Sequence, residues 1–458
     1  MQEDLIEADA SFTLSDSDIK NIEEDIEKGH DEAVETAIAS LNASDCAELL
    51  EKISEEHRHT LLEQHASAII PDTYVELDPE LCREVLGEME APEVAAIISS
   101  LDSDDAVEVI ENLEDDFQKE VIHQLPLKSR ISVEEGLSFP ENSAGRLLQR
   151  EFVAIPQFWT AGATIDYLRS ASEGELPDNF SDIFILTSNS HVTGRVPLAR
   201  LIQAASQVKL EGLSHEEIYS IPATMDQEEV AQIFRRENLL SAAVVDSESR
   251  MIGVITIDDV VDVIDEEAQE DLLKLAGVDQ GSLYHDVFST SFSRFRWLFI
   301  NLVTAILASA VISFFDATIQ QIVALAILMP IVASMGGNAG TQALTVAVRA
   351  LAMREVSNIN AFRVVWKETM VGALNGIVFA LLIGFITVFW FHNAKLGIII
   401  AVAMIINMLV AGFFGAAIPI LLNRMGSDPA VSSTVLLTTL TDVIGFFVFL
   451  GLAAIFLI

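Results

Sequence analysis

Cysteine is almost absent from this sequence. Cys46 and Cys82 are the only two, and neither stands in a CxxC pair. The sequence therefore indicates neither a disulfide framework nor a zinc site, and it predicts two buried thiols. A Walker-type phosphate loop and an HExxH pair are also lacking, so neither ATP-driven pumping nor zinc-dependent hydrolysis is indicated. We expect a protein that is not an enzyme.

Basic residues are few, and they are unevenly distributed. The chain has 26 Lys and Arg against 69 Asp and Glu, a formal net charge of -43, yet 51% of its residues are hydrophobic. From His285 onward there are 8 basic and 6 acidic residues, so all of the excess negative charge precedes that residue. The sequence thus predicts a strongly acidic soluble part followed by an apolar part. With this balance we expect no nucleic-acid partner.

The first residues lack the basic and apolar regions of a secretory signal peptide, and we expect them to lie in the cytosol. The apolar part contains long hydrophobic runs, each of about the 20 residues that a helix needs to cross a bilayer. These runs are 297–315, 322–351, 371–391, 396–422 and 430–458, and they predict five membrane crossings.

The basic residues beside these runs predict an orientation, because cytoplasmic loops carry more Lys and Arg. If the acidic part is cytoplasmic, Lys395 alone falls on the outer side. The inner side then holds Arg294, Arg296, Arg349, Arg354, Arg363, Lys367 and Arg424. We expect a multi-pass protein of the cell membrane with a cytoplasmic N-terminus and an external C-terminus.

Two features of the apolar part are polar. Residues 330–342 read Pro-Ile-Val-Ala-Ser-Met-Gly-Gly-Asn-Ala-Gly-Thr-Gln, and polar backbone at membrane depth is tolerated only against protein or a water-filled cavity. Asp442 stands alone among apolar residues, where a carboxylate costs about 2.5–3.5 kcal/mol and usually marks an ion path or a proton relay. One acid with a few amides and hydroxyls suits Mg²⁺, which keeps most of its water.

Plainer explanations exist for both features. The small residues could serve close helix packing, and Asp442 could be satisfied by hydroxyls within a packed bundle. Asn375 and Asn407 are more typical of helix–helix hydrogen bonds than of a pore. An intramembrane aspartyl protease needs two facing carboxylates, and no second acid lies in the apolar runs. A membrane-anchored sensor that conducts nothing would have no need of Asp442.

The soluble part contains an internal repeat between residues 152 and 264. The first copy places a strand that ends at Pro156 before a helix and a strand pair containing Gly194, and the second copy does the same with Pro222 and Gly253. A polar insert near 174–182 accounts for the greater length of the first copy. The repeat predicts a tandem strand-helix-strand-strand-helix unit.

The segments on either side of the repeat are predicted to be helical. Apolar residues in 17–131 recur at i, i+3 and i+4, and Asp/Ser-rich stretches at 42–45 and 101–105 are typical of helix N-caps. After the repeat, Asp259, Asp262, Glu266 and Glu270 fall on one helical face, where like charges oppose one another by a few tenths of a kcal/mol per pair. Either the face is solvated or a cation offsets the repulsion.

The repeat resembles a pair of CBS domains. Together with the Gly-Gly-Asn-Ala-Gly-Thr-Gln segment and the Thr-Thr-Leu-Thr-Asp-Val-Ile-Gly segment at 438–445, the chain from about residue 17 to its end resembles the MgtE family of magnesium channels and transporters. The resemblance implies an all-α transmembrane bundle of five helices, a cytosolic α-helical superhelix domain and α/β tandem CBS domains. The implied boundaries are 1–16 (disordered), 17–132 (N domain), 133–264 (CBS pair), 265–290 (plug helix, with its helical part at about 266–286) and 291–458 (pore domain).

The resemblance also implies a function. It predicts influx of Mg²⁺, with Co²⁺ as a second candidate, through a homodimer in the lipid bilayer, gated by cytosolic Mg²⁺ and with ATP as a candidate modulator at the CBS pair. A divalent cation would relieve the self-repulsion of the acidic domains and so favour a compact, closed state. The implied metal-binding residues are Asp442, Gly337, Asn338 and Gly340 in the pore, Asp428 at its mouth, Asp259, Asp262, Glu267, Glu270, Asp271, Asp226 and Glu228 in the CBS and plug region, and Asp104, Asp105 and Glu108 in the N domain.

Two departures from the family pattern stand out. Thr434 and Val435 replace the family's usual Asn or Gly and its Pro, which questions a helix kink and leaves Thr434 in the place of one pore ligand. Asn238 stands where an acidic residue is common, so we expect one sensing site to be weaker.

Overall fold

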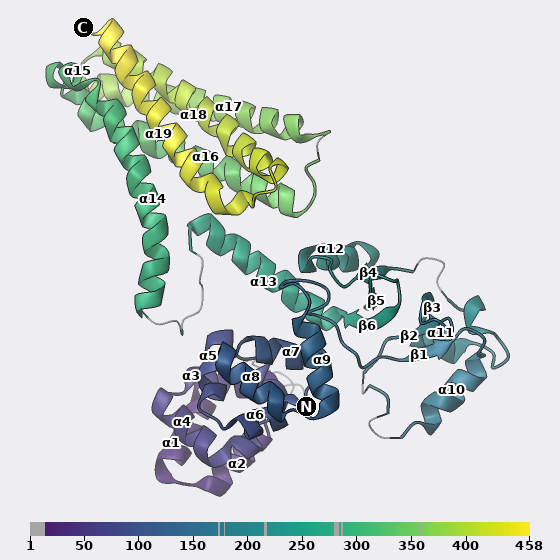
Figure 1. Ribbon diagram of the computed structural model, residues 1–458. Coiled ribbons are helices and arrows are strands. Elements are labelled where there is room, and N and C mark those ends of the chain that lie inside the picture. The colour runs from purple at the N-terminus through teal and green to yellow at the C-terminus, as the bar shows by residue number, and fades with distance from the viewer. Residues whose placement is uncertain are drawn as a thin grey trace, which may run out of the picture. The chain divides into compact units, whose positions relative to one another are not determined.

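The computed structural model describes residues 14–172, 175–177, 179–214, 218–278, 284, 287–357 and 359–458, apart from the side chains of 430–432 (Figure 1). The chain divides into two compact units, Met1–Glu267 and Ala268–Ile458. Most of the segment expected to be disordered, part of the polar insert and most of the last residues of the expected plug helix lie outside the described residues.

The first unit begins with a helical domain. Its core is built from the predicted apolar positions: Leu49, Leu50 and Ile110 are fully buried. Asn42 caps its helix by accepting the N–H of Asp45 at 2.7 Å, as the sequence predicts. Cys46 and Cys82 are buried free thiols, also as predicted. The elements are α1 (Asp16–Lys28), α2 (Asp31–Ala39), α3 (Ala43–Lys52), α4 (Glu55–His65), η1 (Ala66–Ala68), η2 (Pro71–Tyr74), α5 (Pro79–Gly87), α6 (Ala91–Ile98), α7 (Ser103–Glu111), α8 (Asp115–Gln124) and α9 (Leu127–Leu137).

The predicted repeat is confirmed by two three-stranded sheets of identical topology. In each sheet the first pair of strands is parallel and the second is antiparallel, with a bulge one residue beyond the partner of Gly194 or Gly253. The first copy comprises β1 (Ala154–Pro156), α10 (Ala161–Ser170), β2 (Asp182–Leu186), β3 (Val192–Pro197), α11 (Leu198–Gln203) and η3 (Leu210–Gly212). The second comprises β4 (Ser220–Pro222), α12 (Gln227–Glu237), β5 (Ser241–Val245), β6 (Met251–Thr256) and α13 (Ile257–Ala276).

The two copies meet through residues at equivalent positions. Asp182 opens β2 and Ser241 opens β5, and the Ser241 hydroxyl donates to the Asp182 carboxylate at 2.8 Å. Arg195 forms an ion pair with Asp182 at 3.0 Å and donates to the Ser241 carbonyl at 3.1 Å. Asp182 is 5% exposed, so this contact fixes the pairing of the sheets from inside.

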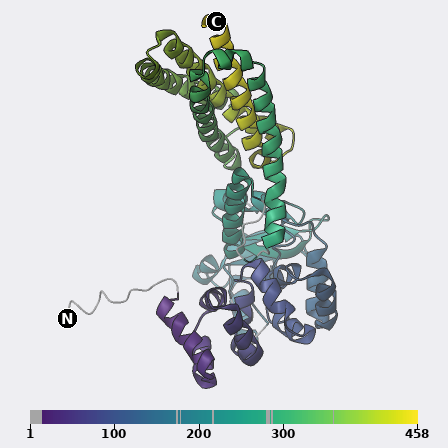
Figure 2. The same ribbon diagram turned by 90° about the vertical axis from the view of Figure 1, so that its left-hand side faces the viewer.

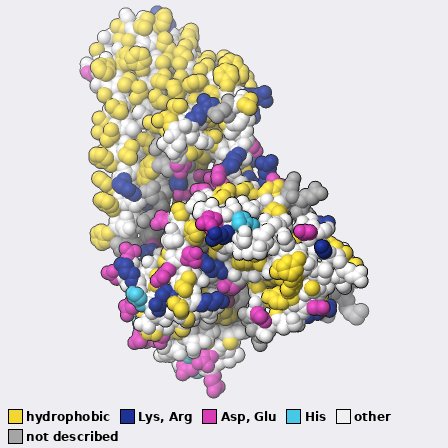
Figure 3. Space-filling view, turned by 45° about the vertical axis from the view of Figure 1, so that its right-hand side comes forward, with side chains coloured by type: hydrophobic (Ala, Val, Ile, Leu, Met, Phe, Trp, Pro, Cys, Tyr) yellow, Lys and Arg dark blue, Asp and Glu magenta, His cyan; other side chains and the backbone are white. Residues whose placement is uncertain are grey.

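The second unit is a helical bundle (Figures 1 and 2). Within the described part of the chain, five of its helices are long and apolar enough to cross a membrane, which confirms the predicted number. The most buried of them, α18, packs against α16, α17 and α19, and hydrophobic side chains cover most of the face of the bundle that is seen in Figure 3. The elements are α14 (Val287–Ser313), α15 (Asp316–Gln321), α16 (Ala324–Ala352), α17 (Ala361–Phe391), α18 (Ala394–Arg424) and α19 (Pro429–Phe456).

The polar membrane segments are helical throughout. The helix α16 continues through Pro330 and the glycine-rich stretch, and α19 continues through Thr434. The helix α17 begins ten residues before its apolar run, so the buried Glu368 belongs to this helix although it precedes the run. Small residues let the helices approach closely, as the packing alternative proposed: a Cβ on Gly415 would lie 2.6 Å from the carbonyl oxygen of Gly340.

Candidate cation sites

Carboxylates of the helical domain and of the two-copy repeat lie together in one cluster. The first turns of α7 carry Asp104, Asp105 and Glu108, and the first turns of α13 carry Asp259 and Asp262. In each helix the spacing i, i+3 places carboxylates on one face. The structure therefore brings together five of the residues that the sequence predicted as sensing ligands, from segments far apart along the chain.

Contacts at the start of α7 hold the two domains together beside this cluster. The backbone N–H and the hydroxyl of Ser103 donate to Glu151 at 3.2 and 2.8 Å. Asp102 occupies the N-cap position of α7 but makes no capping bond with its side chain, and it accepts from Gln149 at 3.0 Å instead. The expected N-cap thus serves as a contact between domains.

Burial and mutual repulsion disfavour negative charge in this cluster. Burial, followed by the charge of Asp259, raises the pKa of Asp105 to about 7. Burial, followed by the charge of Glu266, raises the pKa of Glu108 to about 8. Burial also raises the pKa of Asp259 to about 6, although a hydrogen bond from Thr256 partly opposes the shift. The pKa of Asp262 is raised by burial and then by neighbouring acids.

Asp104 is the most constrained member of the cluster. It is 8% exposed, and its Oδ1 atom is buried without a hydrogen-bond partner. Burial, then the charges of Asp259 and Asp105, raise the pKa of Asp104 well above its ordinary range. A buried carboxylate oxygen without a donor favours a proton or a cation as its partner.

The cluster is an open arrangement rather than a finished coordination shell. Among the described residues, no group of three or more His, Cys, Asp or Glu side chains is already placed to hold a metal ion. Mg²⁺ commonly binds through one or two carboxylates and keeps several waters. The donor set is therefore suited to a hydrated divalent cation, and unsuited to zinc, which prefers nitrogen and sulfur ligands in a closed shell.

Three other predicted ligands lie at or beside the start of α12. Asp226 caps this helix by accepting the N–H of Glu228 at 2.9 Å, and Glu228 accepts from Gln232 at 3.0 Å. Glu267 of α13 accepts from Gln227 at 2.9 Å. The bond between Gln227 and Glu267 places the start of α12 against the middle of α13. Asn238 ends α12 in the left-handed conformation, with φ 51°, which Asn tolerates better than most residues.

A second group of charges lies at the end of α13, in the second unit. Lys274 forms ion pairs with Glu270 in the same helix and with Asp428, just before α19, the second at 2.8 Å. Burial and then the charge of Asp428 raise the pKa of Asp271, while Lys274 opposes that shift. The helix ends at Ala276, about ten residues before the end that the resemblance implied for the plug helix, and Gly277 follows with φ 71°.

The predicted pore residues lie on α16 and α19, which pack against each other. Asp442 is partly buried in α19. A Cβ on Gly337 would meet nothing within 4 Å, whereas one on Gly340 would lie 2.9 Å from Leu437. Asn338 is exposed and donates to Ser334 at 3.5 Å. Gly337 and Asn338 therefore border open space, while Gly340 is a packing position.

Asn407 lies between α16 and α19. It is fully buried and donates to the carbonyl of Val332 at 2.9 Å, which confirms the predicted helix–helix hydrogen bond. A Cβ on Gly336 or on Gly445 would come within 3 Å of the Asn407 amide. Asn407 thus fixes the spacing of α16, α18 and α19. This contact lies close to Asp442, because Asp442 is one helical turn from Gly445.

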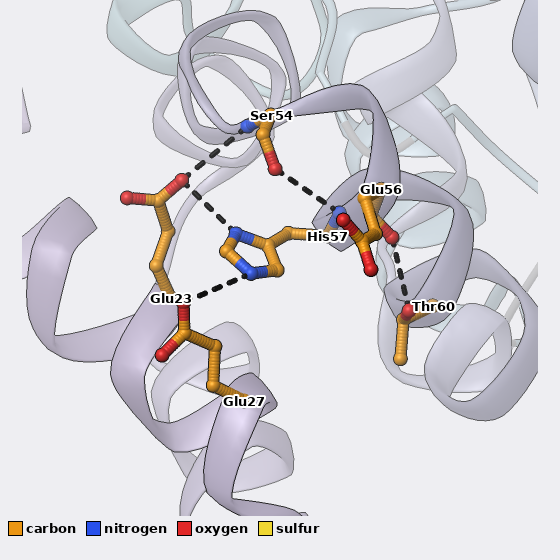
Figure 4. Close-up of polar contacts among 6 residues, drawn as sticks. All are labelled: Glu23, Glu27, Ser54, Glu56, His57 and Thr60. Atoms are coloured by element: carbon orange, nitrogen blue, oxygen red, sulfur yellow. Dashed lines mark hydrogen bonds and ion pairs between the residues drawn. The ribbon is translucent and has the colours of Figure 1, made fainter.

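A histidine with two carboxylates fastens α1 to α4 (Figure 4). Glu23 contacts His57 Nδ1 at 3.2 Å and accepts the N–H of Ser54 at 3.3 Å, and Glu27 lies 3.5 Å from His57 Nε2. Sequence reasoning did not single out these residues. The i, i+4 spacing of Glu23 and Glu27 in α1 is the only sequence signal. The contact holds two helices together and is not a metal site.

Comparisons with known proteins agree with this architecture. Family models match residues 41–142 (MgtE intracellular N domain), 210–266 (CBS domain) and 329–452 (MgtE, divalent cation transporter). The chain is 29% identical to the magnesium transporter MgtE of Bacillus subtilis (strain 168) over 423 residues, 92% of this chain and 93% of the relative. It is 32% identical to the protein of the same name from Thermus thermophilus, over 72% of this chain and 73% of the relative.

One solved structure with a similar sequence is the cytosolic domain of the Mg²⁺ channel MgtE in complex with ATP. Its identity to this chain is 24% and the TM-score is 0.49, with coverage of 54% of this chain and 99% of that one.

Proposed function

The chain belongs to the MgtE family, and from that premise we propose that it carries Mg²⁺ across the cell membrane into the cytoplasm and closes when cytoplasmic Mg²⁺ is high. The observation that carries the proposal is the carboxylate of Asp442 within the apolar run of α19, in a bundle of five membrane-length helices and beside the helix that bears Gly337 and Asn338. A buried acid in such a bundle is costly unless it serves an ion path.

The ion path follows from the same residues. Asp442 would hold a hydrated Mg²⁺ through its carboxylate, and Asn338 would contribute an amide on the facing helix. Gly337 would leave room for the water shell. Asp428 would attract cations at the cytoplasmic mouth, where Arg349 and Arg424 belong to the basic side expected to face the cytoplasm.

The sensing site would be the carboxylate cluster of α7 and α13. Its raised pKa values reflect burial and then mutual repulsion, and without a cation that repulsion would favour separation of the domains. A divalent cation bound between Asp104 and Asp259 would offset that repulsion and stabilise the compact state. Differential binding to the compact state is sufficient to close a gate.

Two further parts of the proposal concern assembly and ligands. We propose that the protein is a homodimer. Only 6% of the most apolar stretch of α14 is buried within this chain, so most of the surface of this helix is left for lipid or a second copy. ATP is proposed as a modulator at the CBS pair, where Phe152 and Phe180 line a pocket together with Asp182 and Asp258. These acids would oppose a free triphosphate, so the magnesium complex of ATP would be the ligand.

Reconstituted vesicles test the transport proposal. Mg²⁺ uptake should fall by about tenfold or more in Asp442→Asn, because about 1.4 kcal/mol of lost ion binding is a factor of ten. Asp316→Asn, at an exposed acid in α15, is the matched control and should transport normally. Normal uptake by Asp442→Asn would contradict the pore role of Asp442, whereas a wild type without Mg²⁺ uptake would favour the second reading, a membrane-anchored sensor that conducts nothing. Competition by Co²⁺ in the same assay measures selectivity.

A further inference from the structure

The last turn of α13 ends in a motif that leaves the Leu275 carbonyl for a partner outside the helix. Gly277 has φ 71°, and its N–H donates to the Lys274 carbonyl at 3.0 Å, while the N–H of Val278 donates to the Leu273 carbonyl at 2.9 Å. This pair of bonds is a Schellman motif, which satisfies two of the terminal carbonyls. The hydroxyl of Thr434 in α19 donates to the Leu275 carbonyl, which lies outside the motif, at 3.2 Å.

The same turn carries a positive charge to the start of α19. Lys274 Nζ lies 2.8 Å from Asp428 Oδ2, and the two side chains are 25% and 36% exposed. Burial would lower the pKa of Lys274, but hydrogen bonds to Asp428 and Glu270 outweigh it and hold the pKa above its ordinary value. Lys274 therefore stays protonated throughout the physiological pH range.

An apolar contact completes the attachment. Leu275 packs against a buried cluster formed by Leu344, Val348, Ile418 and Leu437, which belong to α16, α18 and α19. The last turn of α13 is thus held to the membrane helices by an ion pair, a hydrogen bond and a hydrophobic contact.

The charged groups around Lys274 also leave a net negative charge that the lysine does not neutralise. Glu270, Asp271 and Asp428 lie within electrostatic reach of one another and of Lys274. Three carboxylates and one ammonium carry a net charge of -2 when all four are ionised. One divalent cation would neutralise that charge, so the ammonium supplies part of the compensation and Mg²⁺ the rest.

We propose that Lys274 is a tethered cation that keeps the last turn of α13 attached to α19 when no Mg²⁺ is bound, so that Mg²⁺ strengthens an existing contact instead of creating one. The effect of this attachment on ion flow rests on the proposed transport function. Lys274 is then a positioning residue that limits ion leakage through the channel at low internal Mg²⁺. Thr434 acts with it by holding the Leu275 carbonyl.

Hydrogen exchange of α13 in the full-length protein tests the attachment without measuring transport. In lipid nanodiscs with EDTA, Lys274→Met should raise exchange of the last turn of α13 by about two- to fivefold, the range expected for a partly exposed ion pair. Asp428→Asn should produce the same increase, and the two changes together should add little to either. Lys274→Arg and the exchanged pair Lys274→Glu with Asp428→Lys should restore protection.

Matched controls separate this attachment from helix stability. Glu270→Gln removes the pair within α13 and should raise exchange less than Asp428→Asn, which lies on another element. Lys367→Met removes an exposed charge of the same unit and should leave α13 unchanged. Unchanged exchange in Lys274→Met and Asp428→Asn would overturn the proposal, and so would an equal effect of Lys367→Met.

Flux measurements test the consequence. Vesicles with Lys274→Met should conduct about two- to fivefold more Mg²⁺ than the wild type when the cytoplasmic side is free of Mg²⁺, and the difference should vanish at saturating Mg²⁺. A difference that persists at saturation, or its absence at zero Mg²⁺, would overturn the gating role. If the wild type itself carries no Mg²⁺, the transport proposal fails, while the exchange experiment still decides whether Lys274 holds α13.

Discussion

Asp104 of the helical domain and Asp259 of the CBS pair lie close enough that the charge of Asp259 raises the pKa of Asp104. Asp104 belongs to α7 and Asp259 to α13, so the repulsion acts between two domains and not within one helix. Protons and divalent cations can both relieve it. The stability of the soluble part should therefore depend on pH and on Mg²⁺ together.

Without divalent cations, stability should fall as pH rises. The folded state keeps protons on Asp105 and Glu108 up to about pH 7 and 8, whereas the unfolded chain loses them at about pH 4. Between these limits the folded state binds more protons, so the free energy of unfolding decreases with increasing pH. Melting temperatures of the full-length protein in EDTA, from pH 5.5 to 8.5, measure this slope.

Mg²⁺ should raise the melting temperature more at pH 8.5 than at pH 5.5, because at low pH protons already occupy the cluster. The triple change Asp104→Asn, Asp105→Asn, Glu108→Gln should flatten the pH dependence. Asp115→Asn with Asp116→Asn, at exposed positions of α8, is the control. An equal slope in both variants would contradict the assignment of the effect to the cluster.

Closure should depend on the carboxylates in the second half of α13. Changing Glu267 and Glu270 to Gln and Asp271 to Asn removes three negative charges that a cation would compensate. We expect the internal Mg²⁺ concentration for half inhibition of flux to increase by about tenfold, equivalent to about 1.4 kcal/mol of binding. The Asp115, Asp116 variant should inhibit normally, and an unchanged inhibition curve for the triple variant would argue against a role of this segment.

The crossing of α16 and α18 should not tolerate a larger residue. A Cβ on Gly415 would lie 2.6 Å from the carbonyl oxygen of Gly340 and 2.8 Å from Ala343. Gly415→Ala should destabilise the bundle by about 1–3 kcal/mol through overpacking. Thermal unfolding in detergent measures the loss. Gly337→Ala in α16 is the control for stability, since a Cβ there meets nothing within 4 Å.

The pairing of the two sheets should depend on Asp182. Its carboxylate is buried and paired with Arg195, so Asp182→Ala leaves a partly buried guanidinium without its counter-charge. Removing one partner of a buried pair costs roughly 3–5 kcal/mol. Limited proteolysis and melting of the full-length protein should both show the loss. Asp166→Ala, at an exposed site of α10, should be neutral.

The elements with a periodic or repeated pattern could be predicted from the sequence. Pro156 and Pro222 end the first strand of each copy, and Gly194 and Gly253 occupy matching positions beside a bulge. Hydrophobic length alone predicted the five membrane helices. In these cases the signal is local, because strand, helix and membrane span each impose their own spacing on neighbouring residues.

Contacts between distant segments could not be predicted in the same way. The partner of Lys274 is Asp428, and the partner of the Thr434 hydroxyl is a backbone carbonyl, which has no signature in a sequence. Thr434 was expected as a substitute pore ligand, and that role stays a prediction. The early end of α13 did have a signal, since Gly277 is a typical residue just past a helix C-terminus.

The helix α13 carries Asp259 and Asp262 in its first turns and Lys274 in its last. A helix of 20 residues is about 30 Å long. In the proposed gating, a cation bound at the first turns would therefore act on the last turn over that length, through the backbone hydrogen bonds of one helix.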